Sequence, residues 1–125
     1  LREIHFSSCN LKKAMVFSIK IPPVKKVFIE NCDKMISLEG FQQLINLVEL
    51  RIRKCPMLAT LKGLEETRKL QLIILDDCGS LQNVEALLDL PKLETFKMHS
   101  CGIKKANLPG SLQVIVETRT SYQDW

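Results

Sequence analysis

The chain has 125 residues, of which 46% are hydrophobic and 26% charged, and its formal net charge is +4. This length fits one domain, and no run of about 18 apolar residues predicts a membrane-spanning helix. The small basic excess does not indicate a nucleic-acid partner, because acidic residues are interleaved with the basic ones.

Five short strands are predicted in chain order, each within a nine-residue segment that ends in cysteine. The segments are LREIHFSSC, VKKVFIENC, LVELRIRKC, LQLIILDDC and LETFKMHSC. In each segment, the residues five and three places before the cysteine are both apolar. This period of two places both side chains on one face of a β-strand.

The five cysteines are 23 residues apart, at Cys9, Cys32, Cys55, Cys78 and Cys101. Zinc sites use short Cys-x2-Cys pairs, and a disulfide framework usually has an even number of cysteines, so neither is favoured. A constant period between about 20 and 50 residues is instead typical of repeat proteins. We therefore predict that the cysteines form a structural ladder, one per repeat, and that redox or metal roles are less favoured.

The segments between the strands carry an apolar residue at every third place, such as Met35, Leu38, Phe41 and Leu44 after Cys32. A three-residue step favours short 3-10 turns or an irregular return over a long α-helix. Gly40 and Gly63 occupy the same place in successive repeats, where a larger side chain is expected to crowd the next coil.

The repeat changes after Cys101, where a sixth strand is predicted within SLQVIVETR (residues 111–119). The repeat register, with a return four residues shorter, would point Glu117 inward. Simple alternation would instead place Leu112, Val114 and Val116 on one apolar face. An atypical last coil suits a C-terminal cap. No such cap precedes Leu1, so we expect residues 1–125 to be one domain of a larger protein.

The segments resemble the leucine-rich repeat, L-x-x-L-x-L-x-x-N/C-x-L, over essentially the whole chain. The resemblance implies an α/β-type repeat solenoid with a concave parallel β-sheet and short 3-10 or irregular convex segments. It also implies that the cysteine lies where each strand ends and satisfies backbone groups that leave the sheet. No metal or other cofactor is expected.

The return segments CPMLATLKGLEETRKL and CGSLQNVEALLDLPKLE, with LPGSLQVI near the end, resemble a particular group of leucine-rich repeats. They are similar to the C-terminal repeats of plant intracellular nucleotide-binding leucine-rich repeat immune receptors. This resemblance implies a protein-recognition module of a disease-resistance receptor, which senses pathogen effectors or autoinhibits the receptor through its concave face. The alternative is the substrate-recognition repeat of an F-box-type ubiquitin ligase.

A cytoplasmic location is expected, because five unpaired thiols suit a reducing compartment and no N-x-S/T sequon occurs. We do not expect an enzyme. The one close Cys–His pair is His99 with Cys101, and Cys101 occupies the inward ladder position, which is unfavourable for a nucleophile.

In leucine-rich repeats, recognition is carried by the variable strand residues that face outward on the concave side. Apolar groups at such exposed positions form a possible contact patch, and arginine is a frequent interface anchor. We therefore predict that a protein partner, either an effector or another domain of the parent, contacts Phe28, Arg51, Ile74, Lys97, Leu72, Arg53 and His99. Two alternatives remain open. The charged residues Glu30, Arg53 and Asp76 can simply pair across strands, or the surface can be merely solvated.

Overall fold

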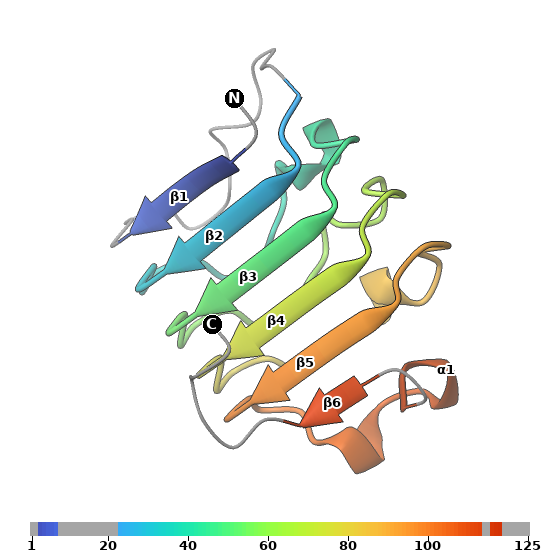
Figure 1. Cartoon of the computed structure of the whole chain (residues 1–125). Helices are drawn as coiled ribbons and strands as arrows, with labels where there is room; N and C mark the ends of the chain where they lie inside the picture. The colour runs from blue at the N-terminus through green and yellow to red at the C-terminus, as the bar shows by residue number, and fades with distance from the viewer. Residues whose placement is uncertain (1–2, 8–22, 114–115, 119–125) are drawn as a thin grey trace.

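The computed structural model describes residues 3–7, 23–113 and 116–118, and within these the chain forms a parallel β-solenoid. Figure 1 shows the strands side by side in chain order, with the return segments between β2 and β5 running behind the sheet to the start of the next strand. The strands are β1 (Glu3–Ser7), β2 (Lys26–Glu30), β3 (Glu49–Arg53), β4 (Leu72–Asp76), β5 (Thr95–His99) and β6 (Val116–Thr118).

The strands β1 to β5 pair in the register that the 23-residue period predicts. Ile4 pairs with Val27, Val27 with Leu50, and the series continues through Ile73 to Phe96. From β2 to β5, the residues of this row are fully buried. Burial of one large aliphatic side chain contributes about 1.5–3 kcal/mol, so the repeated inward rows supply most of the stabilisation of the sheet. The five predicted strands are confirmed.

The return segments are built from short turns, as the three-residue step predicts. After Cys32, the amide of Met35 donates to Cys32, that of Phe41 to Leu38, and that of Leu44 to Phe41, at 2.9–3.3 Å. A hydrogen bond to the residue three places back is the mark of 3-10 structure. Within the described ranges, three such turns are long enough to be named: η2 (Phe41–Gln43), η3 (Glu85–Leu87) and η4 (Lys105–Asn107). The side chain at each three-residue step therefore points into the solenoid.

Successive return segments also hydrogen-bond to one another, and this brings their backbones very close. The amide of Leu38 donates to the carbonyl of Lys62 at 3.0 Å. The next residue, Gly63, has a φ of +119°, and a Cβ atom built on it would lie 1.9 Å from the carbonyl oxygen of Leu38. The expected crowding at this glycine position is confirmed, since only a residue without Cβ fits between the two coils.

The C-terminal coil differs from the prediction in two ways. Residues 111–113 belong to a single helical turn, α1 (Gly110–Gln113), and β6 is the part of the predicted strand that the structure describes as a strand. Val116 pairs with Phe96 and Glu117 with Lys97, so the last return is three residues shorter than the repeat, not four. The predicted conflict over Glu117 disappears, because this register aligns it with the outward row of Lys97.

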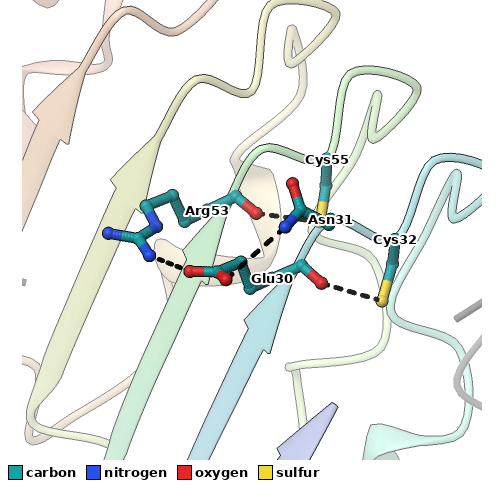
Figure 2. A network of polar contacts seen from close by, with 5 residues as sticks. All are labelled: Glu30, Asn31, Cys32, Arg53 and Cys55. Carbon is teal, nitrogen blue, oxygen red and sulfur yellow. Dashed lines mark hydrogen bonds and ion pairs between the residues drawn. The ribbon is translucent and has the colours of Figure 1, made fainter. Parts of the chain in front are cut away.

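Strands β2 to β5 each end in the same turn, which combines a left-handed residue with a cysteine. The residues before the four described cysteines, Asn31, Lys54, Asp77 and Ser100, have φ between 53° and 59°. In the turn drawn in Figure 2, the amide of Asn31 donates to the carbonyl of Arg53 on the next strand at 3.0 Å. The thiol of Cys55 donates to the same carbonyl oxygen at 3.6 Å. The backbone group at the strand end is thus satisfied from two directions.

The cysteines at residues 32, 55, 78 and 101 repeat this arrangement, each with its sulfur 3.5–3.8 Å from the carbonyl oxygen of the last residue of its own strand. These four cysteines therefore occupy equivalent positions at the ends of successive strands. Cys9 lies outside the described residues. Among the residues described, no helix is both long and apolar enough to cross a lipid bilayer.

Candidate functional site

The side chains of alternate strand residues that point away from the solenoid core form what we call the outward face. Its central row runs straight across the sheet, because the register pairs His5 with Phe28, then Arg51, Ile74 and Lys97 in turn. The structure therefore brings four of the predicted contact residues into one line: Phe28, Arg51, Ile74 and Lys97. A second row holds Arg53 and His99, and a third holds Leu72.

An aromatic and cationic stack covers the β1 to β3 end of this face. The rings of His5 and Phe28 are stacked, with centroids 4.6 Å apart and an angle of 15° between the planes. The Arg51 guanidinium carbon lies 5.2 Å from the centroid of the Phe28 ring, which is a cation–π distance. Phe28 and Arg51 are half-buried, while His5 is exposed. Three residues from three neighbouring strands thus form one continuous stack.

Carboxylates beside the stack hold its two polar members in place. The Nε of Arg51 donates to Oε2 of Glu49 at 2.8 Å, and Nε2 of His5 lies 3.2 Å from Oε1 of Glu3. Each carboxylate is two residues before its partner, so it points to the same side of the same strand. Glu49 fixes the direction of the guanidinium, which leaves the ring of Phe28 in the middle of the stack.

The second row of the outward face is a line of alternating charges. Glu30 on β2 forms an ion pair with Arg53 on β3, which Figure 2 shows together with the hydrogen bond between Asn31 and Glu30. Farther along, Nδ1 of His99 lies 3.8 Å from Oδ1 of Asp76, whose side chain is fully buried. Cross-strand pairing, one of the alternatives left open by the sequence, therefore occurs at Arg53. Such pairs are worth little individually when exposed, so they do not decide between binding and structural roles.

The apolar patch expected on the outward face is smaller than predicted. Ile74, expected to be exposed between Arg51 and Lys97, is only 2% exposed. Leu72 and Lys97 are half-buried. In register, Ile74 has a long cationic side chain on each side, and the methylene stems of such residues can cover apolar surface. Its role as a direct contact is therefore weakened, and the accessible apolar centre of this face is Phe28.

A hollow of about 280 Å³ adjoins the aromatic stack, lined by His5, Phe6, Ser7, Phe28 and Glu30. It combines aromatic walls with a carboxylate at its rim. His5 belongs to this site although the prediction did not include it. The signal was present in the sequence, since His5 stands in the same row as Phe28 and one strand away.

The described part of the chain contains no group of three or more His, Cys, Asp or Glu side chains arranged to hold a metal ion. Comparisons with protein-family models, with curated proteins and with solved structures gave no match to this chain.

Proposed function

We propose that this chain is the leucine-rich repeat recognition module of an intracellular plant disease-resistance receptor, and that its outward face binds a protein. The partner is a pathogen effector or another domain of the same receptor, which the module would then autoinhibit. The proposal rests on the repeat pattern of the sequence and on a solenoid whose inward rows are uniform while its outward rows vary in charge and size.

The observation that carries the proposal is the stack of His5, Phe28 and Arg51. Aromatic residues and arginine are the side chains that most often dominate binding energy at protein interfaces. The stack is already ordered by Glu3 and Glu49, so binding would cost little further side-chain entropy. The neighbouring hollow offers space for one side chain of the partner.

Binding measurements on matched double variants test this proposal. Phe28→Ala with Arg51→Ala removes the centre of the stack. Binding is measured to two kinds of candidate partner: a panel of effectors and the remainder of the parent receptor. A matched control is Ile45→Ala with Arg68→Ala, which removes the same kinds of group from two exposed residues of the return segments. We expect the first pair to weaken binding by about tenfold or more, equivalent to 1.4 kcal/mol, and the control pair to leave it unchanged.

Equal losses in both double variants, or no loss in the first, would reject the outward face as the binding surface. The alternative, substrate recognition for an F-box-type ubiquitin ligase, would use the same face. An F-box encoded upstream of Leu1 would favour that alternative, whereas a nucleotide-binding domain encoded there would favour the receptor.

A further inference from the structure

The last described cysteine of the ladder makes a contact that reaches the preceding strand. The thiol of Cys101 lies 3.6 Å from the carbonyl oxygen of His99 on its own strand, as the ladder requires. The same thiol also lies 3.6 Å from the carbonyl oxygen of Leu75, which belongs to β4. The Cys101 side chain therefore leans across the gap between the coils, toward Cys78.

The two turns that carry Cys78 and Cys101 approach each other closely. The amide of Gly102 donates to the carbonyl of Cys78 at 3.1 Å, and a Cβ atom on Gly102 would lie 2.4 Å from the carbonyl oxygen of Gly79. Equivalent residues of neighbouring parallel strands are about 4.8 Å apart, within the range of about 4.4–6.8 Å that a disulfide can bridge. The pair is thus placed for a covalent link without a large movement of the backbone.

Cys101 is also the accessible member of the ladder. Among the described cysteines it is half-buried, whereas Cys32, Cys55 and Cys78 are buried. It lines a hollow of about 380 Å³ together with Met98, His99, Ser100, Ile103, Lys104 and Ala106. Cys101 therefore lies beside a hollow that can hold a small thiol reagent, and the ammonium group of Lys104 favours an anionic one.

The pKa values of the two thiols are shifted in opposite directions. The interaction between the two neighbouring thiols lowers the pKa of Cys101. The same interaction raises the pKa of Cys78, and burial raises it further. The accessible cysteine is therefore the one that ionises first, and the thiolate is the form that attacks disulfides.

We propose that Cys78 and Cys101 form a reversible disulfide, with Cys101 as the point of entry for a glutathione-type disulfide and Cys78 as the resolving thiol. The Cys101 thiolate attacks one sulfur of oxidised glutathione and releases one glutathione thiolate, which takes up the proton that Cys101 lost. The Cys78 sulfur then attacks Cys101, releases the second glutathione thiolate and gives it the Cys78 proton. Two protein thiols are oxidised, and one glutathione disulfide is reduced to two glutathione molecules.

This disulfide would connect the ends of β4 and β5 beneath the outward face. Asp76 and His99, the last residues of these strands, stand two places before the two cysteines. Oxidation therefore fixes the spacing of the charged row at this end of the sheet. The inference goes beyond the proposed function and does not depend on it.

Peptide mapping of the oxidised chain tests the proposal. Trypsin is expected to place each cysteine in a separate peptide, with Cys78 in residues 70–92 and Cys101 in residues 98–104. The folded chain is incubated with oxidised glutathione, free thiols are blocked with iodoacetamide, and the digest is compared with and without dithiothreitol. We expect peptide 70–92 linked to 98–104 to exceed every other cysteine pair combined, and to disappear on reduction. Circular dichroism checks that the chain stays folded.

Two variants serve as test and control. Cys101→Ser should abolish the link and leave Cys78 open to iodoacetamide after unfolding, whereas Cys55→Ser, at the equivalent ladder position, should leave the link intact. A stable glutathione adduct on Cys101, a Cys55–Cys78 link of equal yield, or a link formed only in urea would each overturn the proposal. The map of the unmodified sequence decides the question even if a variant does not fold.

Discussion

Neighbouring residues of a single strand have opposite roles in this molecule. In β3, Leu50 and Ile52 are fully buried, while Arg51 between them is half-buried and lies over the ring of Phe28. The inward rows hold only apolar side chains, because each one packs on its equivalents in the coils above and below. The outward row varies from His5 through Phe28 and Arg51 to Ile74 and Lys97. The residues that stabilise the fold and those of the proposed binding surface can therefore change independently, one residue apart.

The largest effect on the free energy of unfolding is expected at Gly63, where two return segments approach too closely to accept a Cβ atom. Gly63→Ala places a Cβ atom against the carbonyl of Leu38 at a φ of +119°, so the two coils must separate. We expect a loss of about 4 kcal/mol or more in the free energy of unfolding, measured by urea denaturation. Gly79→Ala is the matched control, because a Cβ there has nothing within 4 Å. Equal losses in the two variants would contradict the close packing of the coils.

The next effect concerns the inward row of the sheet. Leu50→Ala removes a fully buried side chain from β3 and leaves a cavity between Val27 and Ile73. We expect the free energy of unfolding to fall by about 2–5 kcal/mol. Leu88→Ala, which shortens a leucine that is 41% exposed, is the control and should cost much less. A loss below that of the control would show that β3 is not held by its inward face.

A smaller change, of the opposite sign, is expected at the turn after β3. Lys54 has a φ of 57°, a left-handed conformation that asparagine adopts more readily than lysine, and Asn31 fills the equivalent position one coil earlier. Lys54→Asn should stabilise the chain by about 1 kcal/mol. Lys62→Asn, at an exposed lysine without a positive φ, should not. The melting temperatures of the two variants make the comparison.

The smallest effect belongs to the outward face. Arg51→Ala removes a cation–π contact of the kind worth about 0.5–1 kcal/mol at exposed sites, together with its ion pair to Glu49. The free energy of unfolding should fall by no more than about 1 kcal/mol. Arg51→Lys keeps the charge but loses the flat guanidinium. Its free energy of unfolding should therefore lie between those of the unmodified chain and Arg51→Ala. A loss as large as that of Leu50→Ala would mean that the outward face also holds the fold.

The sequence predicted the parts of the fold that repeat. The 23-residue period fixes the pairing of Val27 with Leu50 and of Leu50 with Ile73, because each coil must place equivalent residues side by side. The three-residue step in the returns predicted their 3-10 turns for the same reason, since the residue that points inward is also the one that hydrogen-bonds three places back. In a repeat protein, residues one period apart in the sequence are neighbours in space, so a local sequence pattern also predicts contacts between coils.

The parts that do not repeat were predicted less well. The register of β6 depends on one shortened return with no second copy for comparison, and an error of one residue exchanges the inward and outward rows. The burial of Ile74 depends on the side chains and segments around it, not on its own place in the strand. The stack of His5 on Phe28 and the leaning of Cys101 toward β4 depend on rotamers, which the pattern does not determine.

The central claim is that alternate residues of the same strands divide stability from recognition. Two double variants, one residue apart, test it most directly: Phe28→Ala with Arg51→Ala on the outward face, and Ile29→Ala with Ile52→Ala on the inward face. The free energy of unfolding should fall by about 4 kcal/mol or more in the inward pair, or the chain should not fold, since each buried isoleucine costs about 2–5 kcal/mol. The outward pair should remain folded and lose less than half as much. Similar losses in the two pairs would contradict the claim.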